Sequence, residues 1–244
     1  IGFGISSVLA HEGAIPFIVG RNEQDNLLAV ELMQNNGGNA FYVTADLCEP
    51  AACKFAIEMV AKQCGSIDGI VNNAGVNDGV GLKSGNYEAF IASLHKNLVH
   101  YFLIVHHALP HLIKTKGSIV NIGSKTAETG HGNTSGYSAS NGGRNALTRE
   151  WAVELLPYGI RVNAVIVAEC YTPLYERWIQ TFDNPDEKLK QINENIPLGK
   201  RMTTDEEIAN ATVFLLSGKS SHTTGQLIHV DGGYVHLDRA ICPF

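Results

Sequence analysis

Four polar residues in the middle of the chain attract attention together, and two of them, a serine and a tyrosine, carry hydroxyl groups that could act on an alcohol. Asn97 lies in "HKNLVH", Ser124 ends the apolar run "GSIVNIGS", and Tyr137 opens "GYSASNGG", with Asn141 four residues later. An alcohol gives up a hydride only as its proton leaves, so a base must contact its oxygen. The tyrosine could be that base, and the serine could hold the same oxygen by a hydrogen bond.

At position 141 the cation that this chemistry needs beside the tyrosine is missing. Tyrosine, with a pKa of about 10, is a poor base at neutral pH unless a neighbouring cation favours its phenolate. Asn141 lies one helical turn after Tyr137, on the same face, and carries no charge. Lys125 is one possible substitute, although strand alternation turns it away from Ser124. Arg144 is another and lies a turn further along, so the sequence leaves the source of the charge open.

The elements that must position these residues alternate between strands and helices. Apolar runs of strand length occur at residues 14–20, 39–45, 68–75, 116–124, 160–168 and 226–233. Segments of helix length lie at residues 22–36, 49–64, 86–114, 136–157 and 204–217. This alternation predicts βαβ units in one α/β domain over residues 1–244, a doubly wound parallel sheet of Rossmann type in three α/β/α layers. Ligands of such sheets bind at the carboxyl ends of the strands, where Ser124 is expected.

Two regions depart from this alternation. The chain opens directly on the helix-like "IGFGISSVLAHEGA", so the sheet lacks its first strand in this sequence, and we expect the natural protein to be longer. Residues 169–203 form a long, aromatic and charged insertion after a strand. Long insertions at this edge are usually functional, which favours a substrate lid over a surface loop or an oligomer contact.

Composition excludes several classes of protein. The 244 residues are 44% hydrophobic and 17% charged, which is ordinary for a globular protein with a sizeable core. The formal net charge of −6 argues against binding nucleic acid or an anionic membrane through bulk charge, and no apolar run is long enough to span a bilayer. Five cysteines, an odd number without a CxxC pair, indicate a reducing compartment and therefore the cytoplasm.

Histidines gather in the segment 86–114. His107 and His111 are four residues apart, a spacing that can hold a metal on a helix. No carboxylate or cysteine set completes a site there, so we expect a helix face or a subunit contact, and no metal.

The motifs together resemble those of the short-chain dehydrogenase/reductase superfamily. They are "DGIVNNAG", the asparagine of "HKNLVH", "IVNIGS", the tyrosine of "GYSAS" and "GQLIHVDGG", in order along nearly the whole chain. The resemblance implies a nicotinamide cofactor, NADP or NAD, and hydride transfer between a secondary alcohol and a ketone, or a hemiacetal and a lactone. It also implies a small-molecule substrate and a homo-oligomer, a tetramer, with helices 86–114 and 136–157 at the subunit interfaces.

The resemblance also implies roles for the four polar residues. Ser124 would hydrogen-bond the substrate oxygen, Tyr137 would exchange its proton, and Asn97 would hold a water in the proton relay. The superfamily has a lysine four residues after the tyrosine, which lowers the pKa of the tyrosine and hydrogen-bonds the cofactor ribose. Asn141 stands at that position here and could still donate to a ribose.

Positions matching the superfamily's cofactor contacts follow the predicted strands. Ile1-Gly2 matches the last letters of its glycine-rich TGxxxGIG turn, which would meet the pyrophosphate at a helix N-terminus. Arg21 could pair with the 2′-phosphate of NADP, with a solvated loop arginine as the alternative. The remaining matches are Asp46 for the adenine, Asn72, Ala74 and Gly75 for the ribose and sheet centre, and Thr172 for the carboxamide.

A narrower resemblance points to sugar dehydrogenases of the L-fucose dehydrogenase type. It rests on "NNAGVNDGVGL", "SKTAETGHGNTSGY", "VAECYTPLYERW" and "HVDGGYVHLDRA". It implies oxidation of an aldose such as L-fucose to its lactone. Candidate sugar contacts, each with a surface or structural role as the alternative, are Asn77, Asp78, His131, Asn133, Glu169, Tyr171 and Trp178. The competing hypothesis is a catalytically impaired relative that only binds cofactor or ligand, because Asn141 replaces the lysine.

Overall fold

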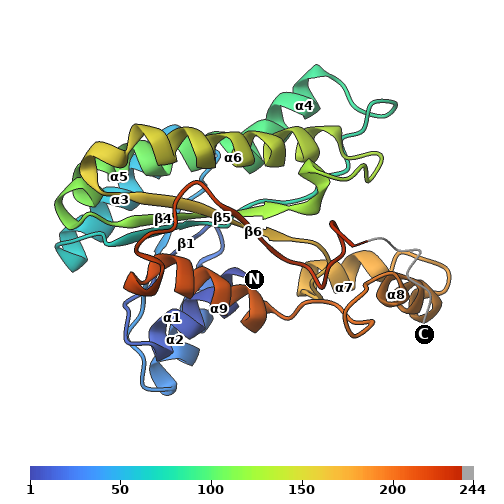
Figure 1. The fold of residues 1–244 in the computed structure, drawn as a ribbon, viewed down its shortest axis with the longest axis horizontal. Helices are drawn as coiled ribbons and strands as arrows, with labels where there is room; N and C mark the ends of the chain where they lie inside the picture. The colour runs from blue at the N-terminus through green and yellow to red at the C-terminus, as the bar shows by residue number, and fades with distance from the viewer. Residues whose placement is uncertain (238–244) are drawn as a thin grey trace.

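The computed structural model describes residues 1–237, which form parallel strands between two layers of helices (Figure 1). The strands are β1 (Phe17–Gly20), β2 (Phe41–Thr44), β3 (Gly69–Asn72), β4 (Ser118–Ser124), β5 (Arg161–Val167) and β6 (Leu227–Val230). Every strand pairing is parallel, in the orders β1-β2 and β3-β4-β5-β6. The predicted α/β class and doubly wound sheet are confirmed.

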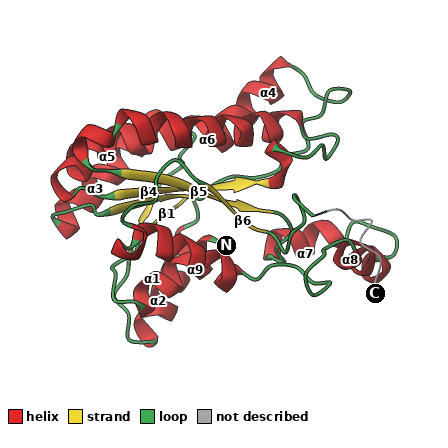
Figure 2. Cartoon of the chain, viewed as in Figure 1, coloured by secondary structure: helices red, strands yellow, loops and turns green. Residues whose placement is uncertain are grey.

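Helices cover both faces of the sheet, as the predicted βαβ units require (Figure 2). One face carries α3 (Pro50–Cys64), α5 (His100–Thr115) and α6 (Ser135–Glu154), and the other carries α1 (Gly2–His11), α2 (Glu23–Asn35) and α9 (Asp205–Leu216). Because both faces are covered, every residue of β4 is buried. A rigid central strand therefore ends at Ser124.

The sheet is in two pieces. Within residues 1–237, β1 and β2 form a two-stranded sheet that is not hydrogen-bonded to the four strands from β3 to β6. The helix α1 precedes β1, so the predicted order of elements at this end of the chain is confirmed.

The segment expected as one helix over residues 86–114 is interrupted. It consists of α4 (Tyr87–Leu94), a π-helical turn (His95–Val99) and α5. Such wider turns occur often at functional sites. This one contains Asn97, a catalytic candidate.

The insertion 169–203 folds into two helices, α7 (Pro173–Ile179) and α8 (Pro185–Glu194), which lie to one side of the sheet (Figure 1). Its ends meet, because Cys170 and Thr203 form an isolated β-bridge and the Thr203 N–H donates to the Glu169 carbonyl at 3.0 Å. The insertion is thus an arm held closed at its base, and we call it the α7–α8 arm.

The structure also bears on two expectations, one about membrane-spanning segments and one about the cysteines. Within residues 1–237, none of the helices has the length and apolar character needed to cross a membrane. Cys48, Cys53, Cys64 and Cys170 are free thiols. Cys242 and the last three residues of "HVDGGYVHLDRA" lie outside the described part of the chain.

Candidate active site

Tyr137 and Asn141 lie in the first two turns of α6, as predicted. The Asn141 side chain is 0% exposed, and its Nδ2 donates to the Tyr137 carbonyl oxygen at 2.9 Å. The amide therefore faces into the protein and closes one helical turn. The expectation that it donates to a ribose stays a prediction that this geometry does not favour.

Arg144, two turns after Tyr137, is buried against Asn141. It is 3% exposed, and its Nη1 donates to Asn141 Oδ1 at 3.0 Å. The same nitrogen donates to the Ile122 carbonyl at 3.1 Å, and Nε donates to the Asn97 carbonyl at 2.6 Å. One guanidinium thus ties α6 to β4 and to the π-helical turn.

Within residues 1–237, the surroundings of Arg144 provide no counter-ion. All three of its acceptors are uncharged oxygens, and its buried Nη2 has no hydrogen-bond partner among the described residues. A Cβ on Gly75 would lie 2.7 Å from that Nη2, so only glycine lets the loop after β3 pass so close. The Tyr101 ring lies 4.3 Å from the guanidinium carbon, which gives a cation–π contact.

Tyr101 is a second tyrosine near Arg144, but it is unsuited to be the base. Its hydroxyl donates to the Ile122 carbonyl at 3.2 Å and its side chain is fully buried. Burial raises the pKa of Tyr101 to about 12, despite the opposing effect of Arg144. Tyr137, half-buried at the start of α6, remains the candidate base.

Asn97 is buried and holds the loop after β3. Its Oδ1 accepts from the Val76 N–H at 2.7 Å, and its Nδ2 donates to the Ser93 carbonyl at 3.0 Å. His100 supports the same loop, with its ring nitrogens 3.0 Å from the His95 carbonyl and 3.1 Å from the Ala74 carbonyl. The relay water at Asn97 stays a prediction, and the observed role of the side chain is to fix this loop.

Ser124 ends β4, two residues after Ile122, so the two side chains share a face of the strand. It is buried, and its Oγ accepts from the Thr126 N–H at 3.3 Å. The hydroxyl is therefore fixed at the carboxyl edge of the sheet, where the sequence predicts it.

Lys125 turns away from the four polar residues, as strand alternation predicts. Its buried Nζ pairs with the Glu169 carboxylate at the base of the α7–α8 arm and lies 3.9 Å from the centre of the Tyr234 ring. Burial, followed by the charge of Glu169, raises the pKa of Tyr175 well above its usual range. Lys125 is thus an anchor for the arm and does not supply the charge missing at position 141.

The remaining sugar candidates lie on the α7–α8 arm and in loops at the same edge of the sheet. On the arm, Tyr171 and Trp178 each contact the ring of Tyr175, with centroids 6.1 and 5.1 Å apart. The Asp78 carboxylate accepts from Ser93 Oγ at 2.8 Å and contacts Lys96 Nζ at 3.5 Å. The exposed candidates in the neighbouring loops are Asn77, His131 and Asn133.

Comparison with known proteins identifies the family. A family model described as enoyl-(acyl carrier protein) reductase matches residues 1–235. A 3-oxoacyl-(acyl-carrier-protein) reductase, FabG, from Thermotoga maritima is 33% identical over 96% of this chain and 93% of its own. The chain belongs to the short-chain dehydrogenase/reductase superfamily. It is therefore an oxidoreductase that acts on CH–OH groups.

Other members of the superfamily resemble the chain in sequence or structure. A glucose and ribitol dehydrogenase from Daucus carota is 32% identical over 96% of this chain and 81% of its own. The crystal structure of Cj0485 dehydrogenase has a TM-score of 0.93 and 42% identity, covering 98% of this chain and 92% of that one. An NAD⁺-bound xylitol dehydrogenase has a TM-score of 0.88 at 27% identity, covering 95% and 94% of the two chains.

Most residues matching the superfamily's cofactor contacts follow the carboxyl ends of the strands. Arg21 and Asp46 are exposed after β1 and β2, Ala74 and Gly75 follow β3, and Thr172 follows β5. Asn72 is different, because its buried Nδ2 donates to Asn121 Oδ1 at 2.9 Å and so ties β3 to β4. Gly2 begins α1, a helix without a side-chain cap or an acidic residue in its first turn.

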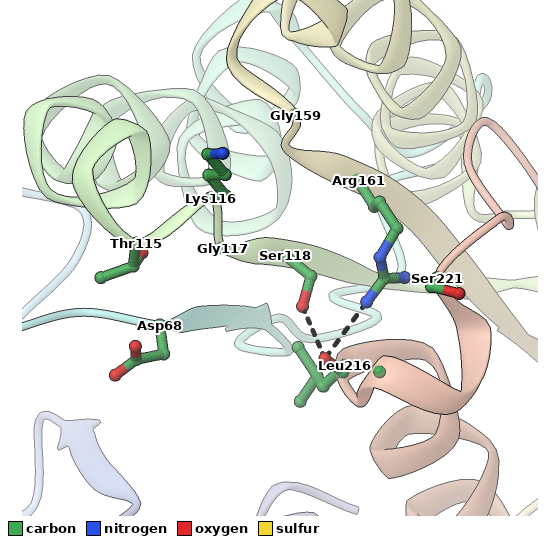
Figure 3. A pocket seen from close by; sticks show the side chains of 10 residues that line it. Asp68, Thr115, Lys116, Gly117, Ser118, Gly159, Arg161, Leu216 and Ser221 are labelled. Carbon is green, nitrogen blue, oxygen red and sulfur yellow. Dashed lines mark hydrogen bonds between the residues drawn. The ribbon is translucent and has the colours of Figure 1, made fainter.

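A hollow at the opposite edge of the sheet is not this site. Its volume is about 340 Å³, and it lies at the amino ends of β4 and β5 (Figure 3). Ser118 Oγ and Arg161 Nη2 both donate there to the Leu216 carbonyl, at 3.0 and 3.2 Å. These bonds join the strand starts to α9, so the hollow has a structural explanation.

The sequence motifs did not indicate that Arg144 is a buried part of the site. It belongs to none of the motifs that carry the resemblance, and it lies seven residues after Tyr137. The available signal was a charged residue on the buried face of a helix, on the same side as Tyr137.

Proposed function

We propose that this short-chain dehydrogenase/reductase oxidises the anomeric carbon of an aldose such as L-fucose to its lactone, with NADP or NAD as the hydride acceptor. The observation that carries the proposal is the polar surface beside Tyr137, where Asn77, His131 and Asn133 are exposed and the Gly136 N–H donates to the Val80 carbonyl at 3.1 Å, which joins the two loops. Amide and imidazole groups on these loops can hydrogen-bond a polyhydroxylated substrate, whereas an acyl chain would need apolar surroundings.

The roles of the residues follow from their positions. Ser124 Oγ donates to the anomeric oxygen and orients it toward Tyr137. The Tyr137 phenolate takes the hydroxyl proton as the C1–H bond breaks, which leaves a C1 carbonyl. When bound, the nicotinamide supplies the acceptor for the hydride.

The residues present fit a dinucleotide. The first turn of α1 holds no acidic residue, and the positive end of a helix dipole suits a pyrophosphate. Close contacts confine the neighbouring loop, since a Cβ on Gly2 would lie 2.7 Å from Asn73 Nδ2. Exposed Arg21 favours NADP through its charge, and the relatives support either form: one structural neighbour contains NAD⁺ and another, an actinorhodin polyketide ketoreductase, contains NADPH.

The α7–α8 arm is proposed as the substrate lid. Its base is fixed by the β-bridge between Cys170 and Thr203, while Tyr171 and Trp178 on it are exposed. Aromatic rings on such an arm can cover a sugar ring as the arm closes. The proposed setting is a cytoplasmic homotetramer.

A substrate panel tests the proposal. Purified protein is mixed with NAD or NADP and with L-fucose, other aldoses, polyols or a 3-hydroxyacyl thioester, and the absorbance of reduced cofactor is followed. We expect the highest kcat/KM with an aldose, and a lactone product by mass spectrometry. A preference for the thioester would contradict the sugar assignment.

The second candidate function is a relative that binds cofactor without turnover. The observation that favours it is the buried Asn141 amide, which occupies the lysine position without a charge. Cofactor binding by calorimetry, with no turnover of any panel member, would support this alternative.

A further inference from the structure

Arg144 is a buried cation that has only neutral partners. Placing an ion inside a protein is unfavourable unless an opposite charge or full hydrogen bonding offsets the lost hydration. Here the guanidinium donates to two backbone carbonyls and one amide, and one of its nitrogens has no acceptor among the described residues. The site therefore gains stability when a negative charge forms nearby.

Tyr137 is joined to this cation through Asn141. Arg144 Nη1 donates to Asn141 Oδ1, and Asn141 Nδ2 donates to the Tyr137 carbonyl, so two hydrogen bonds link the guanidinium to the first turn of α6. Both Arg144 and Tyr137 also act on Tyr101, the first lowering its pKa and the second raising it. Arg144, Tyr101 and Tyr137 thus belong to one electrostatic environment, in which Tyr137 is the half-buried member.

We propose that Arg144 supplies the positive charge that stabilises the Tyr137 phenolate, in place of a lysine at position 141. It acts through Asn141 and is a positioning residue. Asn141 suits this arrangement because a neutral amide can accept from Arg144 and at the same time donate to the backbone carbonyl of Tyr137. A lysine there would place a second cation beside the guanidinium in a buried site, where like charges repel strongly. Positions 141 and 144 therefore form a coupled pair.

Four variants test the coupling, and the test rests on the proposed oxidation with Tyr137 as the base. Arg144→Gln keeps a hydrogen-bond donor without the charge, and Arg144→Lys keeps the charge. Asn141→Lys adds a cation beside Arg144, and the double variant Asn141→Lys/Arg144→Gln moves the single cation to position 141. Arg149→Gln, an exposed arginine on the same helix, is the matched control.

The expected results depend on how many cations each variant has at positions 141 and 144. Arg144→Gln lowers kcat about 100-fold near pH 7 with little change in KM, and its rate recovers as the pH rises. Arg144→Lys loses less than Arg144→Gln, the double variant regains most of the turnover, and Arg149→Gln behaves as the wild type. Asn141→Lys alone gives no gain, because the charge is already present.

Two outcomes would overturn the proposal. One is an Arg144→Gln enzyme that keeps the wild-type pH–rate profile, and the other is a large gain from Asn141→Lys while Arg144 is intact. Ultraviolet difference spectra against Tyr137→Phe give a readout that needs no substrate, since phenolate should form at lower pH with Arg144 than with Gln. If no aldose is turned over, the sugar assignment fails while these spectra still decide the role of Arg144.

An independent cluster lies at the outer edge of the sheet. Glu128, His229 and His236 each place one ligand atom within 4.8 Å of the others. His229 Nε2 is 2.9 Å from Glu128 Oε2, and the two imidazole rings are perpendicular with centroids 4.3 Å apart. Asn145 Nδ2 donates to the other carboxylate oxygen at 3.5 Å and so orients it. The three ligands come from the segment after β4, from β6 and from the turn after β6.

We propose that this cluster binds one transition-metal dication of the Zn²⁺ class. Two imidazoles and one carboxylate are a ligand set that Zn²⁺ accepts in tetrahedral geometry, with the fourth position left for water. The cluster borders a hollow of about 620 Å³, which leaves room for that water. A bound ion would tie the turn after β6 to β6 itself and to the segment after β4. The histidines of α5, where the sequence suggested a metal spacing, are not part of the cluster.

Titration with Co²⁺ and Zn²⁺ tests the site in tag-free protein. We expect one ion per chain, tetrahedral Co²⁺ absorption bands, and a higher Tm with Zn²⁺. The His229→Asn and His236→Asn variants should each weaken binding at least tenfold, whereas His131→Asn, an exposed histidine outside the cluster, should not. Equal affinity in all three variants, or no binding by the wild type, would overturn the proposal.

Discussion

The first turns of α6 and the α7–α8 arm both flank the carboxyl edge of the sheet, but they are built differently. In α6 the groups around Tyr137 are buried and joined by hydrogen bonds, from Asn141 to Arg144 and on to β4. In the arm the aromatic side chains of Tyr171 and Trp178 are 48% and 40% exposed, and both contact the ring of Tyr175.

This difference assigns distinct tasks to the two regions. A proton transfer needs charges and donors that stay fixed, because reorganising them would raise the barrier. A polyhydroxylated substrate needs a surface that can open and close around it. We therefore expect changes in α6 to alter kcat and changes in the arm to alter KM or the attachment of the arm.

The largest effect should come from removing the base in α6. Tyr137→Phe is expected to lower kcat about 10³-fold, because phenylalanine has no hydroxyl to take the proton of the substrate while its ring keeps the packing of the fold. Steady-state assays on the best aldose measure the loss, and circular dichroism checks the fold. Retention of more than a tenth of the turnover would show that Tyr137 is not the base.

A change at the base of the arm should act on stability. Glu169→Gln leaves the buried Lys125 cation without its partner, which should lower the free energy of unfolding by about 3 kcal/mol. Urea unfolding measures it, and Lys125→Met/Glu169→Gln should recover much of the loss because no buried charge then remains. A single variant as stable as the wild type would mean that the pair does not anchor the arm.

A change on the exposed part of the arm should act on substrate binding. Trp178→Ala is expected to raise KM for the aldose about fivefold and leave kcat nearly unchanged, since a ring contact contributes about 1 kcal/mol. Tyr87→Ala removes an exposed aromatic ring from α4 and is the control. An unchanged KM would show that Trp178 on the arm does not contribute to substrate binding.

The smallest effect concerns the buried histidine behind the site. Burial lowers the pKa of His100, so the unfolded chain binds the proton more readily than the folded one. The stability contribution of the neutral ring is then complete above the unfolded pKa, near 6.5, and is lost as the pH falls below it. Urea unfolding between pH 7.5 and 5.5 should show a smaller decline in His100→Gln than in the wild type, while His131→Gln should follow the wild type.

Much of the fold could be predicted from the sequence. Apolar runs and helix-length segments place all six strands and most helices within a few residues, because a covered parallel sheet requires continuous hydrophobic strands. The π-helical turn at Asn97 and the helices of the α7–α8 arm were not predicted. Both depend on contacts distant in sequence, such as the one between Asn97 and Val76.

For the candidate site, the sequence by itself determined the types, order and spacing of Asn97, Ser124 and Tyr137, and with them the superfamily. Only the tertiary structure decided where the positive charges lie. Lys125, adjacent to Ser124 in sequence, is directed to Glu169, whereas Arg144 is buried against Asn141. The physical reason is that the effect of a charge depends on its distance and burial, and these are set by how β4, α6 and the π-helical turn pack together.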